Sequence, residues 1–184
     1  EYLAFLASQY CGDSLTPYLV VTTRATGTEK WAPVVRVAAK TWEYGFDDAP
    51  RIAVDESSGR VYVAWTRSLS KQTATIVVSS SSDEGKTWSA AAPVARSLQH
   101  PHHATLAVAP DGAVYIAGID ATLGLWIARS TDGAKTFTKP TAVAQLRANP
   151  AAGCALTAGE PLPKERTGCT GPDPTVGVVK DRAY

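Results

Sequence analysis

The chain has 184 residues, of which 45% are hydrophobic and 19% charged, and its formal net charge is +1. This length suits one domain, and the charge balance argues against the basic stripe of a nucleic-acid-binding surface. No run approaches the roughly 20 apolar residues of a membrane span. We expect no cofactor, no nucleic-acid partner and no membrane span.

Short runs rich in β-branched and aromatic residues recur along the chain, bounded by Gly, Asp, Ser or Pro. Such runs are typical of β-strands. In chain order the predicted strands are residues 1–5, 17–21, 51–55, 60–65, 75–79, 104–109, 113–118, 124–128 and 174–179. Residues 57–59 and 110–112 have the composition of tight turns between strands. No long segment shows helical periodicity, so the sequence predicts an all-β fold.

A turn motif follows the third run of each repeat, at residues 24–31, 81–88 and 130–137. The central copy reads S-x-D-x-G-x-T-W and contains Ser81, Asp83, Gly85, Thr87 and Trp88. The later copy is looser and contains Ser130, Asp132, Thr136 and Phe137. The first copy has Thr26 in place of the Asp. Self-similarity at a fixed period predicts a radial repeat architecture.

The chemistry of this motif, the Asp-box, is predicted to be structural. A short Asp side chain can accept hydrogen bonds from backbone N–H groups across a tight turn. Gly85 suits a backbone conformation that a Cβ would penalise, and Trp88 would cover the hairpin. In the later copy Gly133 precedes the usual position and Ala134 takes it, so that turn is expected to differ in shape. The alternative interpretation makes the Asp a catalytic acid or metal ligand.

Each repeat is therefore predicted to be a four-stranded antiparallel meander, a blade of a β-propeller. The first strand would lie innermost, and the strand after the Asp-box outermost. The repeats span approximately residues 2–61, 62–114 and 115–184, starting and ending within a blade. Since propellers typically close with about four to eight blades, three blades suggest half of a six-bladed propeller. A second copy, another chain or a longer polypeptide would complete it.

Three cysteines are present. Cys154 and Cys169 bracket an insertion rich in Gly, Pro and Lys, and a disulfide between them would constrain this loop. Such a bond would place the protein in an oxidising compartment; the alternative is two buried thiols. Cys11 is left over and would pair outside this chain.

The loops after the second strand, and those between blades, should share one face, which we treat as the ligand face. Aromatic rings stack on sugars, carboxylates act as acids and bases, and arginine binds anionic substituents. The candidate substrate-binding residues on this face are Trp42, Tyr44, Arg67, His100, His102, Asp120 and Asp173.

The candidate catalytic residues are Asp47, Asp48, Arg51 and His103. The adjacent carboxylates suit a general acid or base, or else a solvated turn. Arg51 would point into the channel or lie exposed at a strand end. His103 and its neighbours could transfer protons near neutral pH. Adjacent residues in a strand point to opposite faces, so we predict no metal site there.

On the Asp-boxes and the strand pattern around them, the chain resembles the sialidase superfamily of Asp-box (BNR-repeat) β-propellers. This resemblance implies a secreted or extracytoplasmic protein that acts on or binds glycans, as a glycoside hydrolase or a polysaccharide lyase. The alternative is a non-catalytic propeller that binds a protein or glycan. Arg51-Ile52-Ala53 is similar to the family's Arg-Ile-Pro motif, with a different third residue. No carboxylate lies between Arg67 and Asp83 to serve as the family's catalytic Asp, and its Tyr–Glu nucleophile pair is not identified.

Overall fold

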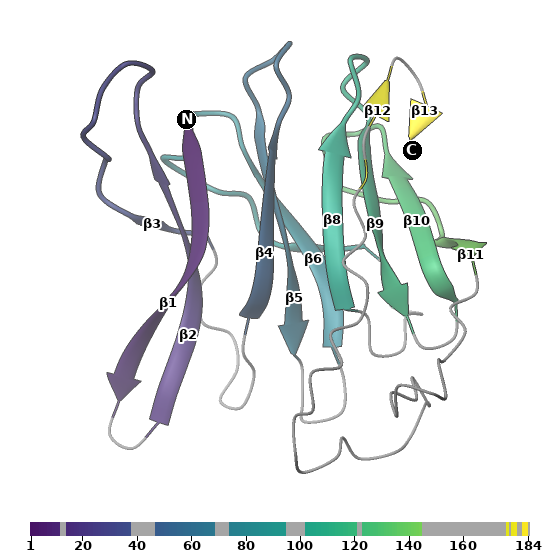
Figure 1. Ribbon diagram of the computed structural model, residues 1–184, viewed down its shortest axis with the longest axis horizontal. Helices are drawn as coiled ribbons and strands as arrows, with labels where there is room; N and C mark the ends of the chain where they lie inside the picture. The colour runs from purple at the N-terminus through teal and green to yellow at the C-terminus, as the bar shows by residue number, and fades with distance from the viewer. Residues whose placement is uncertain are drawn as a thin grey trace, which may run out of the picture.

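The computed structural model describes residues 1–11, 14–37, 47–68, 74–94, 102–120, 123–144, 176, 178–179 and 182–183. All regular elements within these residues are β-strands (Figure 1). They are β1 (Tyr2–Cys11), β2 (Ser14–Thr23), β3 (Val35–Arg36), β4 (Asp47–Val54), β5 (Val61–Ser68), β6 (Ala74–Ser81), β7 (Ala92–Pro93), β8 (His102–Val108), β9 (Val114–Asp120), β10 (Gly124–Ser130), β11 (Thr141–Ala144), β12 (Val178–Val179) and β13 (Arg182–Ala183). No helix in the described part of the chain is long and apolar enough to cross a membrane.

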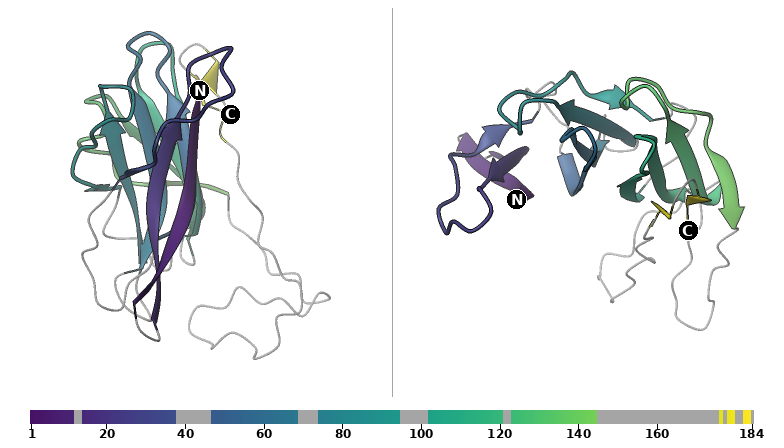
Figure 2. Two further views of the ribbon diagram at one scale, coloured as in Figure 1. Left: turned by 90° about the vertical axis from the view of Figure 1, so that its left-hand side faces the viewer. Right: turned by 90° about the horizontal axis from the view of Figure 1, so that it is seen from above.

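The strands form antiparallel meanders, as the sequence predicted. The second sheet has the order β4-β5-β6-β7, and the third has the same four-strand order, from β8 to β11. The first sheet contains β1, β2 and β3, and β12 pairs with β13. Seen from above, the sheets stand one beside the next along an arc, with β4 on its concave side (Figure 2). The prediction of β-propeller blades is confirmed.

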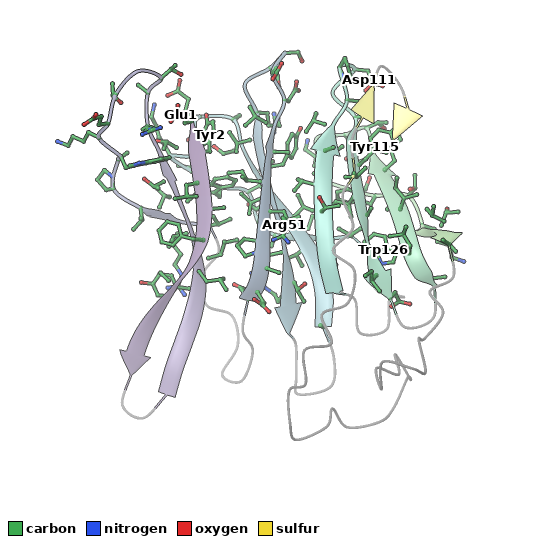
Figure 3. All side chains as sticks on the ribbon, viewed as in Figure 1. Glu1, Tyr2, Arg51, Asp111, Tyr115 and Trp126 are labelled. Atoms are coloured by element: carbon green, nitrogen blue, oxygen red, sulfur yellow. The ribbon has the colours of Figure 1, made fainter. Side chains whose placement is uncertain are left out.

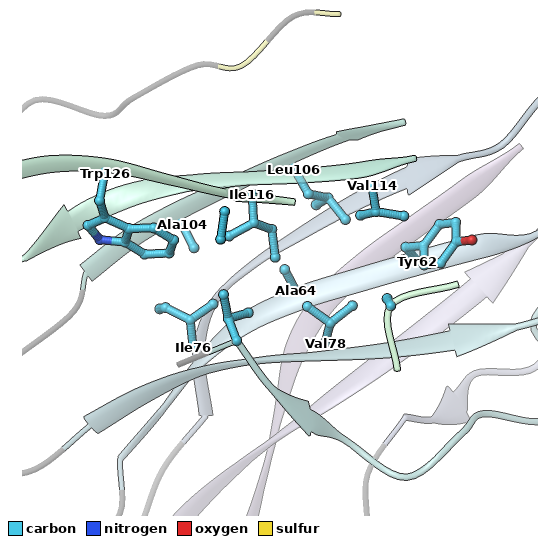
Figure 4. Packing of buried hydrophobic residues seen from close by; sticks show 12 residues of the cluster. Tyr62, Ala64, Ile76, Val78, Ala104, Leu106, Val114, Ile116 and Trp126 are labelled. Atoms are coloured by element: carbon cyan, nitrogen blue, oxygen red, sulfur yellow. The ribbon is translucent and has the colours of Figure 1, made fainter. Parts of the chain in front are cut away.

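The hydrophobic core lies between neighbouring sheets, because both faces of each middle strand are covered. Val63 and Trp65 on β5 pack with Leu19 and Val21 of the first sheet. On the other face of β5, Tyr62 and Ala64 pack towards the third sheet. Figure 4 shows this second cluster, in which Tyr62, Val78, Ile116 and Trp126 are completely or almost completely buried. The alternation of residues along β5 thus joins three sheets into one body.

In the second and third sheets the Asp-box turns connect the third strand to the fourth. Asp83 accepts hydrogen bonds from the Ser81 hydroxyl at 2.7 Å and the Thr87 hydroxyl at 2.5 Å. Asp132 accepts the equivalent bonds from Ser130 at 2.8 Å and Thr136 at 2.6 Å. Each carboxylate therefore connects the two ends of its turn through hydrogen bonds.

The expectation that the two turns differ in shape is wrong. Each turn has two successive left-handed residues, Glu84 and Gly85 with φ of 62° and 83°, and Gly133 and Ala134 with φ of 73° and 65°. The N–H of Gly85 donates to Ser81 at 2.8 Å, and that of Ala134 donates to Ser130 at 3.0 Å. The hydrogen-bond network holds one non-glycine residue in the left-handed region in each turn, so the glycine can occupy either place.

The first copy of the motif is stabilised differently. Thr26 stands at the Asp position, and the Thr28 hydroxyl donates to the Ala25 carbonyl at 2.9 Å. Arg24 forms an ion pair with Glu1 and stacks over the Trp31 ring, 4.8 Å from its centroid. A cation–π contact and an ion pair therefore accompany this turn.

The inner strands of the second and third sheets carry a bulge at the same register position. In β4 the register shifts between Asp48 and Arg51, where β5 contributes one residue fewer. In β8 it shifts in the same way between His102 and Thr105. A bulge bends a strand and redirects its side chains, and here it does so near the start of each inner strand.

Candidate functional site

The described candidate residues gather at one end of the sheets, opposite the Asp-boxes. β4 begins at Asp47 and β8 at His102, whereas β5 ends at Ser68 and β9 at Asp120. Since these strands are antiparallel, all four positions lie at the same end, the lower one in Figure 1. The structure places the backbones of His102 and His103 there also. Trp42, Tyr44, His100, Cys154, Cys169 and Asp173 lie outside the described residues.

Asp47 is held by two side chains from β5. Its Oδ1 accepts a hydrogen bond from the indole Nε1–H of Trp65 at 2.7 Å and from the Nε–H of Arg67 at 3.0 Å. The guanidinium of Arg67 also stacks over the Trp65 ring, 5.0 Å from its centroid. The ion pair is well shielded, with side-chain exposures of 12% for Arg67 and 16% for Asp47. We call Asp47, Trp65 and Arg67 the clamp.

Asp48 and Arg51 flank the bulge of β4. Asp48 is exposed, and its Oδ1 accepts a hydrogen bond from the N–H of Ala49 at 2.7 Å. Ala49 has a φ of 50°, in the left-handed region. The partly buried Arg51 donates from Nη1 to the Pro50 carbonyl at 3.1 Å. Figure 3 shows Arg51 on β4, nearer to the candidate end than Tyr2 and Tyr115.

The clamp and the bulge residues occupy opposite faces of the second sheet. Residues paired across two antiparallel strands point to the same face. Asp48 is opposite Thr66 and Arg51 opposite Ala64, and Ala64 packs towards the third sheet. Asp47 is opposite Arg67, and Trp65 packs towards the first sheet. Of the four carboxylate and arginine candidates here, Asp48 and Arg51 therefore share one face.

The third sheet differs at the equivalent positions. Asp120 has the register position of Arg67 and is buried, and its Oδ1 accepts a hydrogen bond from the N–H of Leu123 at 3.0 Å. Gly118 has the position of Trp65, and it pairs with Trp126 on β10. This sheet therefore closes a β9–β10 turn where the second sheet builds a clamp.

The sequence interpretation missed Trp65 as part of this end of the sheet. A signal was available, because Trp65 precedes Arg67 by two residues in a predicted strand. Side chains at that spacing share a face. The partner Asp47 lies 18 residues before Trp65, and only the strand pairing reveals that contact.

The carboxylates with depressed pKa values lie at the other end of the sheets. The hydroxyl and backbone N–H of Thr87, with the hydroxyl of Ser81, lower the pKa of Asp83 to about 2. Thr136 and Ser130 lower the pKa of Asp132 in the same way. Hydrogen bonds to Ser58 and Ser57 lower the pKa of Asp55. A general acid must carry a proton near the working pH, so these hydrogen bonds favour the structural interpretation of the Asp-box.

Comparison with known proteins shows to which family this chain belongs. Residues 12–155 match the model of the BNR repeat-like domain. The chain belongs to this family. The comparison with curated proteins found no match. The BNR family and the blades described above together define a sialidase-like Asp-box propeller fold.

Solved structures share this fold at low sequence identity. The Hadza microbial sialidase Hz136 aligns with a TM-score of 0.52 and 16% identity over 67% of this BNR chain and 31% of its own. A Dyadobacter fermentans protein of unknown function aligns with a TM-score of 0.52 and 23% identity over 76% of this chain and 42% of its own. The leech intramolecular trans-sialidase aligns with a TM-score of 0.51 and 15% identity over 77% of this chain and 25% of its own. The BNR chain thus spans less than half the length of each of these structures.

Proposed function

We propose that this BNR-repeat chain is part of a secreted, sialidase-like propeller that binds glycans, and acts on them, at the end of the sheets where β4 and β8 begin. The observation that supports this most is the placement of Asp48 and Arg51. They flank one bulge and share one face of the sheet, and their strand β4 lies on the concave side of the arc. Bulges are frequent beside active sites, where they redirect side chains.

In this proposal Asp48 and Arg51 have different tasks. The exposed carboxylate of Asp48 donates or accepts a proton at the glycosidic oxygen or at a water molecule. The guanidinium of Arg51 binds an acidic substituent of the sugar through two parallel hydrogen bonds. His102, His103 and Asp120 remain proposed contributors to the same end. Asp47, which the sequence suggested as a catalytic group, is proposed to support the site through its ion pair with Arg67.

A non-catalytic glycan-binding role is the second candidate, and the clamp favours it. Glycoside hydrolysis commonly uses two carboxylates. Asp47 is engaged by Arg67 and Trp65, which leaves Asp48 as the accessible member of the adjacent pair. Without a second free carboxylate from elsewhere, the end of the sheet would bind a sugar without cleaving it.

A glycan panel combined with turnover assays tests the proposal. Binding of sialylated, uronic-acid-containing, sulfated and neutral oligosaccharides would be measured by calorimetry, and turnover with fluorogenic glycosides. Under the catalytic proposal Asp48→Asn lowers kcat by roughly 100-fold or more, as loss of a general acid or base does. Arg51→Ala weakens binding of acidic glycans. Glu84→Gln, at an exposed position in the Asp-box, is the matched control and leaves both unchanged.

Binding without turnover, weakened by Arg51→Ala, would support the second candidate. Absence of both binding and turnover over the whole panel would overturn the glycan proposal. The proposed partner is tested separately by the native mass of the purified particle. A second copy or a different chain would raise it above the 19.4 kDa of this chain, whereas a three-bladed monomer would contradict completion by association.

A further inference from the structure

We propose that Trp65 and Arg67 are positioning residues that act through Asp47 to fix the bulge carrying Asp48 and Arg51. This inference rests on the proposed function, because it concerns the same end of the second sheet. It assigns a role to Trp65, a residue to which the sequence interpretation gave none. It also makes the clamp an indirect contributor to ligand binding.

The clamp is a closed set of three contacts. One carboxylate oxygen of Asp47 receives two donors, from Trp65 at 2.7 Å and Arg67 at 3.0 Å, and the two donors stack on each other. Charge-assisted hydrogen bonds in a shielded place are among the stronger ones. Asp47 therefore cannot rotate freely, and the first residue of β4 is tied to β5.

Burial excludes direct contact between the Trp65 indole and a ligand in this conformation, and it leaves the Arg67 side chain only 12% exposed. Trp65 is completely buried. The Nη2 atom of Arg67 is buried as well, and it has no hydrogen-bond partner within the described residues. Both side chains lie on the face of the second sheet that packs towards the first sheet, away from Asp48 and Arg51. Their influence on those residues must pass through the backbone of β4.

The register shows where that influence acts. Asp48 directly follows the clamped residue, and Ala49 and Pro50 stand opposite the single residue Trp65. Ala49 is held at a φ of 50°, a conformation that is strained for a non-glycine residue and needs support from its surroundings. Trp65 of the clamp therefore lies on β5 directly opposite the strained part of the bulge.

The third sheet shows that the fold does not need the clamp to form the bulge. β8 has the same register shift, yet Gly118 stands at the position of Trp65 and Asp120 at that of Arg67. Asp120 accepts from Leu123 within its own turn. A bulge therefore forms without this set of contacts, and the clamp is specific to the sheet that carries Asp48 and Arg51.

The test compares Trp65→Phe and Asp47→Asn with Trp88→Phe in the full chain. Trp65→Phe keeps an aromatic ring but removes the indole donor, and Asp47→Asn keeps an acceptor but removes the charge. Trp88→Phe is the matched control, because its indole N–H also makes one hydrogen bond, to Gly85 at 3.1 Å, at the opposite end. Hydrogen–deuterium exchange of residues 47–52 would be measured with glycan binding and kcat and KM.

We expect exchange of residues 47–52 to accelerate by about tenfold in both clamp variants, as loss of one charged hydrogen bond implies, and not in the control. Binding of acidic glycans, or kcat where turnover exists, should fall by a similar factor in both clamp variants, because Arg51 and Asp48 both flank the bulge. If Arg67 touched the ligand, Arg67→Lys would weaken the binding of acidic glycans alone, whereas Trp65→Phe would leave the binding of all glycans unchanged. That pattern would overturn the proposal.

Unchanged exchange in Asp47→Asn would also overturn it, whatever the ligand results. This variant keeps the shape of Asp47 and so remains informative if Trp65→Phe fails to fold. Failure of the glycan proposal looks different: the wild type then shows no binding, while exchange of residues 47–52 still responds to the clamp variants. In that case the clamp would be a support of the strand and not of a site, and the positioning role would be rejected.

Discussion

At the scale of single residues, three tryptophans place their indole N–H groups in different surroundings. Trp65 donates to a carboxylate and Trp88 to a backbone carbonyl. Trp126 is completely buried, and its Nε1 has no partner within the described residues. A buried donor without a partner costs free energy, so its removal relieves that cost. Removal of a bonded donor instead takes a hydrogen bond away from its acceptor. Substitution by Phe should therefore have unequal effects.

We expect Trp65→Phe to lower the free energy of unfolding by about 1–3 kcal/mol more than Trp126→Phe, because it also removes one of the two donors to the Asp47 carboxylate. Both variants lose ring volume in a packed core, so this loss largely cancels in the comparison. Urea unfolding followed by circular dichroism measures the difference. Equal losses would mean that the hydrogen bond to Asp47 contributes nothing to stability.

The pKa of Asp83 predicts how this residue couples stability to pH. Its folded-state pKa of about 2 lies below the ordinary value of 3.8, because Thr87 and Ser81 donate to the carboxylate. A depressed folded pKa gives stability that is present above the unfolded pKa and lost as pH falls towards the folded one. The contribution of Asp83 should therefore be constant above about pH 5 and decrease between the ordinary value of 3.8 and about 2.

Urea unfolding of the wild type and Asp83→Asn at several pH values measures this contribution. The difference between the two proteins should be largest above about pH 5 and shrink as the pH falls towards 2. Ser82→Ala, which removes no titratable group from the same turn, is the control and should show no such convergence. A difference that stays constant down to pH 2 would contradict the role of the ionised Asp83 in connecting the two ends of its turn.

At the scale of elements, the two Asp-box turns each hold one non-glycine residue at a positive φ, Glu84 at 62° and Ala134 at 65°. Glycine adopts this region without a Cβ penalty, although it gives the unfolded chain more freedom. We expect Glu84→Gly to raise the free energy of unfolding by about 0.5–1 kcal/mol, and Ala134→Gly to raise it less, because the Ala134 methyl group is buried in the core. Thermal unfolding would show this as a higher Tm.

Ala90→Gly provides the comparison for these turn variants. Ala90 is exposed in the loop that follows the central box, and it is not among the described residues with a positive φ. This substitution should leave stability unchanged or lower it slightly, because only the unfolded state gains freedom. A loss of stability in both Glu84→Gly and Ala134→Gly would show that the side chains contribute more than the backbone strain costs.

At the scale of the whole molecule, the Asp-box turns of the second and third sheets each contact the preceding sheet. A Cβ placed on Gly85 would lie 3.3 Å from Cγ2 of Thr23 and 3.8 Å from Cε1 of Tyr2, both in the first sheet. One placed on Gly133 would lie 3.8 Å from Nη1 of Arg60 and 4.0 Å from the Tyr62 hydroxyl in the second sheet. The turns therefore join successive sheets as well as closing their own hairpins.

We expect Gly85→Ala to lower the free energy of unfolding by about 1–3 kcal/mol more than Gly59→Ala, the cost of overpacking a close contact. Both glycines have positive φ values, 83° and 70°, so the backbone penalty is similar. A Cβ placed on Gly59 would meet no described atom within 4 Å beyond its chain neighbours, whereas one on Gly85 meets the first sheet. If chemical denaturation showed equal losses of unfolding free energy for the two variants, the contact of Gly85 with the first sheet would accommodate a Cβ at no cost in stability.

The sequence by itself determined the all-β class, the repeats, the Asp-boxes and the end of the sheets at which the candidates gather. Strand periodicity and turn residues are local signals, and antiparallel strands fix which ends meet. Only the tertiary structure decided that Asp47 is clamped by Trp65 and Arg67, that Asp48 and Arg51 flank a bulge, and that both Asp-box turns have one shape. These features depend on register between strands distant in the chain and on hydrogen bonds that override the preference of single residues.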